Sequence, residues 1–379
     1  MNIVEPIFAQ CRNKPADLAL CAPGTQFNLI SYGRLERSAN NVCGRLLSAG
    51  IKPRHRVAVF IDDPIFHSIV LIALMKVGAV TISGCKRNFS WRFVVDAIVT
   101  DRQQDFPAAR VIVAQFDWTT SKSTSERVHF YNPALDDISR IFLAPMDAGE
   151  EKGIAVTNRM VIAGIERLKL FLGRRAPFCA RTYLDQPLAT PLGFQVLLAT
   201  LWRGGALIMR GQPEKTIEAL PIYQVQNIVA SAQSLLDFVT AIEQRRCSQS
   251  QLEAVFCLNG LPEDLWQRTH SRICPNLTVG YLAMDTTMVA SMPAHLAIRN
   301  PGAVGFVLPG VSVEIVDNEG RALPAGIEGK LRISTDYGIA QVLDDRSETQ
   351  RGRVCLSDRG YLTGDNMLII SSQAESAKP

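Results

Sequence analysis

The feature that most constrains this fold is the alternation of short, continuously apolar runs with helical segments. Arg56–Ile61 (RVAVFI) is apolar almost throughout and is followed directly by Asp62-Asp63-Pro64. Asp63 can cap a helix that starts at Pro64, because its carboxylate accepts free N–H groups and a first-turn proline has none to satisfy. That helix is apolar on all faces, which predicts burial on every side. Strands without polar alternation are typical of parallel sheets covered by helices on both faces.

The same alternation continues to about residue 282. Strands are expected at Ala79–Ile82 and Ala109–Ala114, and an amphipathic helix at Trp91–Val99. A helix at Asn158–Leu172 has apolar residues along one side and precedes a repeat of the pattern. The repeat has helices at Phe194–Trp202, Ser234–Ile242 and Pro262–Ile273 and strands at Ala206–Met209, Asn227–Ala230, Leu252–Leu258 and Leu277–Leu282. This order predicts an α/β protein with two doubly wound lobes.

From Pro301 the pattern changes, because glycine and proline punctuate the chain densely. Val311–Val316 alternates apolar and polar residues, Asp317–Gly320 suits a turn, and Leu331–Ile333 returns as a strand. Short antiparallel strands are expected, forming a small barrel-like β subdomain. The expected units are a first lobe at 1–173, a second lobe at 174–298, the β subdomain at 299–370 and a frayed tail at 371–379.

Composition excludes several classes of protein. The 40 basic and 36 acidic residues are mixed and give a net charge of +4, so no nucleic-acid partner is expected. The nine cysteines show no C-x-x-C spacing and do not cluster with the five histidines, which favours free thiols in a reducing compartment. The longest apolar helix candidate, Ile65–Val77, contains His67 and Lys76 and is too short to span a bilayer. No signal peptide is recognisable, so we expect a cytoplasmic protein.

The candidate functional segment is Ile141–Gly153 (IFLAPMDAGEEKG). An apolar run ends in a short turn, and Lys152 and Gly153 follow. Backbone N–H groups and a lysine at the end of a strand suit an anion such as phosphate. The turn is nevertheless poor in the serine, threonine and glycine that phosphate-binding loops usually carry. The sequence therefore predicts a nucleotide-using fold with an altered phosphate loop.

These landmarks, in this order, resemble the large N-terminal domain of the adenylate-forming (AMP-binding) enzymes, such as acyl-CoA synthetases, peptide-synthetase adenylation domains and luciferases. The likeness runs from about Ser31 to Asp365 and is carried by Tyr32–Phe60, by Pro301–Ile333 with its Leu323-Pro324-Ala325-Gly326, and by Leu362-Thr363-Gly364-Asp365. The resemblance implies activation of a small carboxylic acid with ATP and Mg²⁺ to give an acyl-adenylate and pyrophosphate. It also implies a second step in which a thiol, often coenzyme A, accepts the acyl group.

The phosphate loop of this family reads approximately T-S-G-[ST]-T-G-x-P-K-G. Gly149, Lys152 and Gly153 match it, so the resemblance assigns Lys152 a catalytic role and the two glycines a nucleotide contact. The departures are Ala144, Pro145, Met146, Asp147, Ala148 and Glu151. They remove hydroxyl donors, and Asp147 adds a negative charge where polyphosphate should lie. One like-charge contact at ~4 Å costs about 4 kcal/mol at an effective dielectric of about 20.

The resemblance also implies four further nucleotide contacts and a metal ligand. Tyr281 would lie against adenine, and Asn259 and Gly260 would contact adenine and line the acyl pocket. Asp285 replaces the glutamate that holds Mg²⁺, and Asp365 would accept both ribose hydroxyls. Each has a structural alternative: a core aromatic for Tyr281, a cap for Asp285, a strand-to-helix turn for Asn259 and Gly260, and a loop carboxylate for Asp365.

Two departures bear on the complete reaction. Thr190 lies where the family often carries an aromatic–histidine pair that gates the acyl pocket. Only 14 residues follow Asp365, fewer than the family's small C-terminal domain needs, so the resemblance implies that a partner chain would have to supply that domain. Three interpretations stay open: an acid–thiol ligase with impaired adenylation, a non-catalytic pseudoenzyme that binds nucleotide, acyl group or a partner protein, and a relic without selected activity.

Overall fold

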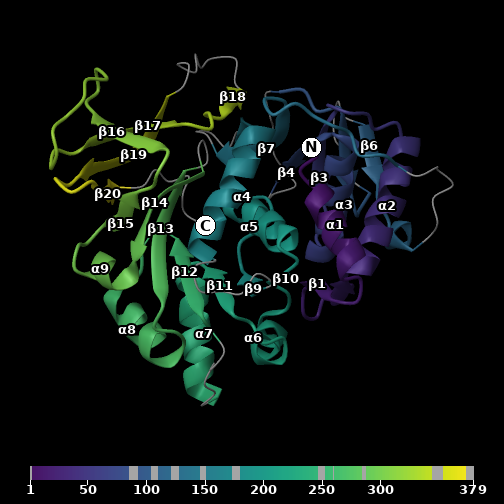
Figure 1. Ribbon diagram of the computed structural model, residues 1–379, viewed down its shortest axis with the longest axis horizontal. Helices are drawn as coiled ribbons and strands as arrows, with labels where there is room; N and C mark the ends of the chain where they lie inside the picture. Colours follow the sequence, from purple (N-terminus) through teal and green to yellow (C-terminus); the bar gives the residue numbers. More distant parts are fainter. Residues whose placement is uncertain are drawn as a thin grey trace.

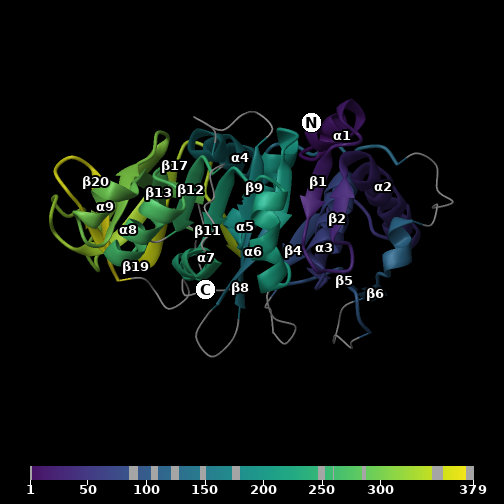
Figure 2. The same cartoon turned by 90° about the horizontal axis from the view of Figure 1, so that it is seen from below.

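Two β-sheets with helices between and around them form the frame of the molecule (Figure 1). The computed structural model describes residues 2–84, 93–103, 110–120, 128–145, 151–172, 180–245, 252–258, 260–283, 287–343 and 353–372. Figure 2 shows that helix α2 (Tyr32–Ser48) and the β subdomain lie at opposite ends of the longest axis. The arrangement confirms the expected α/β class with two sheets.

The first sheet has the strand order β18-β8-β7-β4-β3-β5-β6. Its strands are β3 (Arg56–Phe60), β4 (Val80–Ser83), β5 (Ala97–Thr100), β6 (Arg110–Val113), β7 (Ile138–Pro145), β8 (Glu151–Thr157) and β18 (Gln341–Leu343). Strands β3 to β7 are parallel, whereas β8 runs antiparallel to β7 and β18 antiparallel to β8. The expected doubly wound strand order is therefore present, with an antiparallel edge.

Local sequence rules explain helix α3 (Pro64–Val77), which follows β3. The Asp63 carboxylate accepts the N–H groups of Ile65 and Phe66 at 2.9 Å each, and Pro64 starts the helix as expected. The helix ends at Gly78, whose φ of +86° is a left-handed cap that glycine adopts without strain. Nearly every side chain of α3 is buried, which confirms the prediction made from its apolar faces.

The helix expected at Trp91–Val99 is wrong for the residues that the structure describes. Residues 93–96 are not helical, and Ala97–Thr100 is strand β5, buried along its whole length between β3 and β6. A period read over nine residues does not separate a short helix from a short buried strand. Ile98 and Val99, both β-branched, satisfy the two neighbouring strands better than they would a helix.

The second sheet has the strand order β16-β17-β19-β20-β15-β14-β13-β12-β11-β9-β10-β1-β2. Its strands are β1 (Leu18–Cys21), β2 (Leu29–Ser31), β9 (Arg181–Leu184), β10 (Ala206–Met209), β11 (Asn227–Ala230), β12 (Ala254–Leu258), β13 (Leu277–Ala283), β14 (Thr287–Pro293), β15 (Ala303–Val307), β16 (Val311–Val316), β17 (Gly329–Thr335), β19 (Val354–Leu362) and β20 (Met367–Ser372). Strand β1 pairs in parallel with β10, so strand pairing crosses the boundary expected at residue 173. The unit boundaries stay predictions.

Helices α4 (Asn158–Leu172) and α5 (Pro191–Trp202) form the layer between the sheets (Figure 1). Helix α4 contacts β7 and β8 of the first sheet and β12 and β14 of the second. Helix α5 is buried from Pro191 to Leu201, as its apolar sequence requires. The other helices are α1 (Glu5–Asn13), α6 (Pro213–Ile222), α7 (Ala232–Arg245), α8 (Glu263–Arg272), α9 (Ala294–Ile298) and a 3₁₀ turn at Phe116–Thr119. Within the described ranges, no helix is long and apolar enough to cross a membrane.

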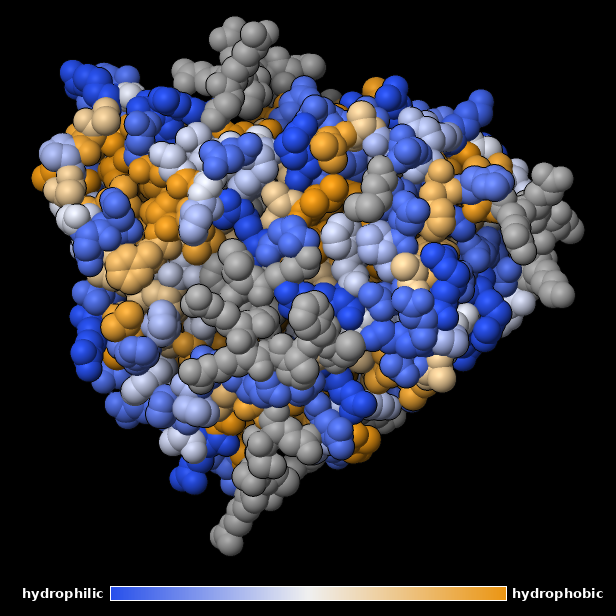
Figure 3. All heavy atoms as spheres, viewed as in Figure 1, coloured by the Kyte–Doolittle hydropathy of each residue, from blue (hydrophilic) through white to orange (hydrophobic). Residues whose placement is uncertain are grey.

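The β subdomain is an antiparallel extension of the second sheet. Strands β15, β16, β17, β19 and β20 pair antiparallel, and the described strands do not close into the barrel that the sequence suggested, because β16 stays at the sheet edge. The sheet curves strongly all the same, since the Tyr281 hydroxyl of β13 donates to the Asp358 carboxylate of β19, four strands away in the sheet. Hydrophobic residues gather on the surface over this subdomain (upper left in Figure 3). Phe306 and Ile327 of the subdomain are among the exposed large hydrophobic residues.

Candidate functional site

The predicted phosphate loop connects the two strands of a β-hairpin. Strand β7 pairs antiparallel with β8, placing Lys152 opposite Ala144 and Gly153 opposite Leu143. The connection itself, with Gly149, Met146 and Asp147, lies outside the described residues. Lys152 therefore lies beside the carboxyl-terminal end of β7 and beyond the last residue pair of β4, on the side of the sheet where α/β folds bind ligands.

Gly153 has a packing role that the sequence did not reveal. A Cβ atom at this position would lie 2.8 Å from Cε1 of Phe93 and 3.0 Å from Cγ2 of Ile141. Real Cβ atoms do not approach other carbons so closely, so glycine lets Phe93 cover this face of the sheet. Its predicted nucleotide contact stays a prediction.

Strand β18 brings the β subdomain next to this hairpin. Leu343 pairs with Gly153 and Val342 with Ile154, although β18 follows β17 in the chain. On helix α4, Nη2 of Arg167 donates to the Pro309 carbonyl at 2.5 Å, and its guanidinium lies 4.5 Å from the centroid of the Tyr337 ring. The subdomain is thus held beside Lys152 by one strand and by one arginine.

Gly260 lies in the turn between β12 and α8, directly past the carboxyl end of a parallel strand. Its φ is +92°, and a Cβ placed there would meet no atom within 4 Å. The neighbouring Cys257 thiol lies 3.7 Å from the Gly260 carbonyl, and burial raises the pKa of Cys257 to about 12, so the thiol is neutral. The turn is open on the Gly260 side, whereas Asn259 lies outside the described residues.

Tyr281 is buried in this conformation. Its side chain is 3% exposed and belongs to the apolar core of the β subdomain, with Val289, Ile333 and Leu368. Its hydroxyl donates to Asp358. These contacts favour the core-aromatic alternative for Tyr281, and its adenine contact stays a prediction. Asp285, the predicted metal ligand, lies outside the described residues.

Asp365 is exposed in the tight turn Thr363–Asn366, here called the β19–β20 turn. The Thr363 hydroxyl donates to its carboxylate, and the Met367 N–H donates to Oγ1 of Thr363 at 3.0 Å. The register Gly280–Ser291–Phe306–Met367 across β13, β14, β15 and β20 places this turn on the carboxyl side of β13. Neighbouring strands lie ~4.8 Å apart, so the three spacings from β13 to β20 amount to about 14 Å along the sheet. Because the Asp365 carboxylate is exposed, it can accept hydroxyl groups of a ligand in addition to the Thr363 hydroxyl.

The sequence reasoning missed a buried carboxylate in the loop Asp185–Thr190, here called the β9–α5 loop. Asp185 is 8% exposed and accepts hydrogen bonds from the Ser231 hydroxyl at 3.0 Å, the Ser231 N–H at 3.3 Å and Nε2 of Gln186 at 3.0 Å. Ser231 in turn accepts the N–H of Ser234 in the first turn of α7. An acidic residue directly after the apolar run of β9 was the available signal.

The position of Asp185 matters because the sheet reverses its strand order there. Strand β9 lies between β10, which follows it through α5, and β11, which lies on its other side. The carboxyl ends at such a switch point form the crevice in which open α/β sheets bind ligands. Asp185 and Ser231 join the two strand ends across that crevice.

A second polar group lies at the carboxyl end of the first sheet. Nε2 of His67 lies 3.0 Å from Oγ of Ser83, and burial together with the charge of Arg140 lowers the pKa of His67 to about 3. The imidazole is therefore neutral at physiological pH. Both residues lie within or next to apolar runs, and no sequence pattern indicates that they meet.

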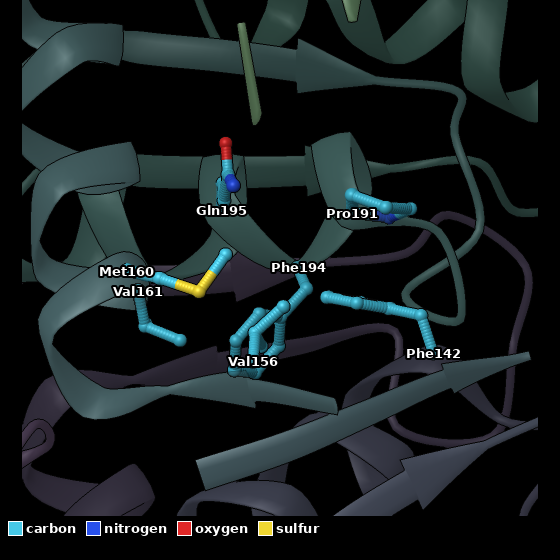
Figure 4. Close-up of a pocket in the computed structure, with 7 residues that line it drawn as sticks. All are labelled: Phe142, Val156, Met160, Val161, Pro191, Phe194 and Gln195. Atoms are coloured by element: carbon cyan, nitrogen blue, oxygen red, sulfur yellow. The ribbon is translucent and has the colours of Figure 1, made fainter. Parts of the chain in front are cut away.

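A small cavity lies between α4, α5 and the first sheet (Figure 4). Its volume is about 10 Å³, which is the space of a single water molecule. The lining residues are Phe142, Val156, Met160, Val161, Pro191, Phe194 and Gln195. Oε1 of Gln195 is buried without a hydrogen-bond partner. The cavity is too small to hold an acyl group in this conformation.

Among the described residues, no group of three or more histidine, cysteine, aspartate or glutamate side chains could hold a metal ion. The described site residues instead comprise one cation, Lys152, one exposed carboxylate, Asp365, and the open turn at Gly260. They lie along the carboxyl ends of β7, β12 and β13. Together they offer a charge for an anion and an acceptor for hydroxyl groups.

Comparison with known proteins gives a consistent picture. The sequence profile of a family described as AMP-binding enzyme matches residues 148–341. The hybrid PKS-NRPS synthetase fsa1 of Fusarium sp. (strain FN080326) is 22% identical, and the match covers 96% of this chain and 10% of that protein. The 2-succinylbenzoate–CoA ligase of Bacillus cereus (strain Q1) is also 22% identical, with 90% of this chain and 73% of the ligase covered. The chain spans about a tenth of the first two curated relatives it matches.

Solved structures share the fold at low sequence identity. O-succinylbenzoate coenzyme A synthetase (MenE) from Bacillus subtilis in complex with AMP has a TM-score of 0.82 at 13% identity, with 98% of both chains covered. The N-terminal domain of FACL13 from Mycobacterium tuberculosis has a TM-score of 0.81 at 16% identity, with 98% of this chain and 100% of that domain covered. At these identities the likeness establishes the architecture alone.

Proposed function

The chain belongs to the family of AMP-binding enzymes, and we propose that it binds an adenine nucleotide and a small carboxylic acid along the carboxyl ends of β7, β12 and β13. The observation that carries the proposal is the placement of Lys152, Gly260 and Asp365 on the carboxyl side of these strands. An exposed carboxylate suits ribose hydroxyls, and a lysine suits phosphate.

We further propose that adenylation of the acid by ATP is impaired. Asp147, Glu150 and Glu151 precede Lys152 closely in the sequence, so the segment that would meet a triphosphate carries three acidic residues beside one lysine. AMP carries less negative charge than ATP, so these acidic residues oppose AMP less. In MenE from Bacillus subtilis, a structure with ATP holds a magnesium ion. Here Asp285 is the residue proposed to hold Mg²⁺, whose chemistry when bound is to neutralise phosphate charge.

Transfer to a thiol is a separate proposal. Coenzyme A or another thiol would accept the acyl group, and a partner domain would complete the site. The multidomain synthetases among the relatives, of which this chain matches about a tenth, support such a partner.

The second candidate function is a non-catalytic module that binds a nucleotide, an acyl ligand or a protein partner. The burial of Tyr281 favours it, because the aromatic side chain expected against adenine is enclosed in the β subdomain core and bound to Asp358. A nucleotide would then rest on other groups, with Asp365 as the principal contact. Catalytic turnover would not follow from such binding.

Pyrophosphate exchange separates the two candidates. Carboxylate-dependent exchange between ATP and labelled pyrophosphate is measured for the wild-type chain, for Lys152→Ala and for Lys52→Ala, an exposed lysine remote from the site. Exchange that Lys152→Ala alone removes supports a ligase. Thermal stabilisation by AMP without exchange supports the binding module, and the absence of both contradicts the whole proposal.

A further inference from the structure

Arg140 is a fully buried cation in the layer between the sheets. It lies in the middle of β7, opposite Thr81 of β4, and its exposed fraction is 0%. Nη1 donates to Oγ1 of Thr81 at 3.2 Å. The guanidinium carbon lies 4.2 Å from the centroid of the Phe194 ring and 4.9 Å from that of Phe142. Burial of a guanidinium is unfavourable unless polar and aromatic groups surround it, so these contacts fix its position.

The same side chain reaches from one sheet to the other. Nη2 of Arg140 donates to the Leu188 carbonyl at 2.7 Å, a short charge-assisted bond. Leu188 belongs to the β9–α5 loop, which follows a strand of the second sheet. A residue of the first lobe therefore holds the backbone of a loop at the switch point of the second.

The β9–α5 loop is held at its other positions too. Asp185 is bonded to Ser231, and the Thr190 hydroxyl donates to the Pro187 carbonyl at 2.8 Å. Oγ1 of Thr190 also accepts the N–H of Gly193 at the start of α5. Arg140 adds a hydrogen bond to the Leu188 carbonyl that comes from the first sheet. The loop is thus tied to both lobes at once.

We propose that Arg140 is a positioning residue for the acid-binding side of the site. Through the Leu188 carbonyl it sets the place of Thr190 and the start of α5, which follow the switch-point strand β9 and would border the bound acid; this inference rests on the proposed function. A loop fixed before binding loses little freedom when the ligand arrives. The bonds described for Arg140 go to Thr81 and to Leu188, and neither residue is among those proposed to bind the nucleotide, so we expect its substitution to separate the two ligands.

The structural part is tested by amide hydrogen exchange in the full chain. Arg140→Met removes the donors at similar length, and Arg140→Lys keeps one charge. Thr81→Val is the matched control, since it removes the acceptor of the Nη1 bond of Arg140 and leaves the bond to the Leu188 carbonyl intact. We expect Arg140→Met to speed exchange in peptides covering 185–193 by about tenfold, which corresponds to ~1.4 kcal/mol, with β3 peptides unchanged. We expect Arg140→Lys to rescue part of the protection and Thr81→Val to leave it intact.

The functional part uses ATP–pyrophosphate exchange with acetate, octanoate, benzoate or aspartate, taking whichever acid the wild type accepts. Arg140→Met should raise KM for that acid by about tenfold and leave KM for ATP within about twofold. Equal changes in both KM values, or faster hydrogen exchange in all peptides of both Arg140 variants, would overturn the inference. If the wild type accepts none of these acids and does not bind AMP, the proposed function fails, and exchange in peptides 185–193 alone decides whether Arg140 holds the loop.

Discussion

The β9–α5 loop and the β19–β20 turn lie at the same side of the molecule but are stabilised in different ways. Asp185, Leu188 and Ala189 of the loop are buried, and the loop is bonded to both lobes, through Arg140 and through Ser231. The turn is exposed, and the described bonds that shape it come from its own Thr363 and the adjacent Met367. The comparison teaches that the scaffold of the candidate site is set by distant residues, whereas the group offered to a ligand, Asp365, is set locally. Substitutions should therefore change stability in the loop and ligand binding in the turn.

The largest effect is expected for Gly193→Ala. A Cβ atom there would lie 2.1 Å from the Pro187 carbonyl oxygen, so the loop must shift or unfold. We expect the free energy of unfolding to fall by about 3 kcal/mol, measured by urea denaturation. The control is Gly364→Ala in the turn, where a Cβ meets no atom within 4 Å and the change should stay within about 0.5 kcal/mol. Equal losses in the two variants would end the distinction between loop and turn.

Asp185→Asn should lower the free energy of unfolding by about 2 kcal/mol. The amide keeps the size of the side chain but places a donor against the donors of Ser231 or Gln186. Asp237→Asn is the matched control, because Asp237 is an exposed carboxylate on α7 bonded to Gln233. A double-mutant cycle with Ser231→Ala should show coupling between the two positions. If the losses of stability in the two single variants simply add in the double variant, the hydrogen bond between Asp185 and Ser231 contributes no coupling energy.

Lowering the pH should reduce the stability of the first lobe, which contains both His67 and Arg140. The pKa of His67 is lowered to about 3 mainly by burial, so the folded state holds the neutral ring and the unfolded state binds the proton first. Its contribution to stability is complete above about pH 6.5 and is lost as pH falls from there toward 3. We expect about 1 kcal/mol, because the ring is partly exposed and water screens the effect. Urea midpoints of the wild type and His67→Gln, measured between pH 7 and pH 4, should converge in acid; parallel curves would contradict this assignment.

The smallest effect on stability is expected for Asp365→Asn, within about 0.5 kcal/mol, because the carboxylate is exposed. AMP binding should nevertheless weaken by about tenfold, since the ribose loses a charged acceptor. The affinity for AMP is measured by isothermal titration calorimetry. The control is Asp136→Asn, because Asp136 is an exposed carboxylate of the first lobe. Unchanged AMP affinity in Asp365→Asn would remove Asp365 from the proposed site.

The features that could be predicted from the sequence are those that depend on residues close together in the chain. The cap of α3 by Asp63 and the bounds of α4 follow from local hydrogen bonding and from the spacing of apolar residues. The order of strands and helices was enough to predict the fold class. Strand β5 was mistaken for a helix because its neighbours β3 and β6, rather than its own period, decide its structure.

The site was predictable only in part. Lys152, Gly260 and Asp365 follow strands or turns that the sequence located, so their placement on the carboxyl side of the strands could be expected. Arg140 and Leu188 are 48 residues apart, and Asp185 and Ser231 are 46 apart, so no local pattern pairs them. The burial of Tyr281 depends on Asp358, a contact across 77 residues. Long-range polar contacts of this kind need the assembled sheet before they can be seen.

The pairing of β18 with β8 has a consequence for how the protein is made. Leu343 leaves the ribosome nearly two hundred residues after Gly153, its partner. Until then β8 has an open backbone edge, which is a template for pairing with other chains. Newly synthesised chains should therefore be most prone to aggregate during that interval, and translation arrested before residue 341 should give products that depend on chaperones more than the finished chain does.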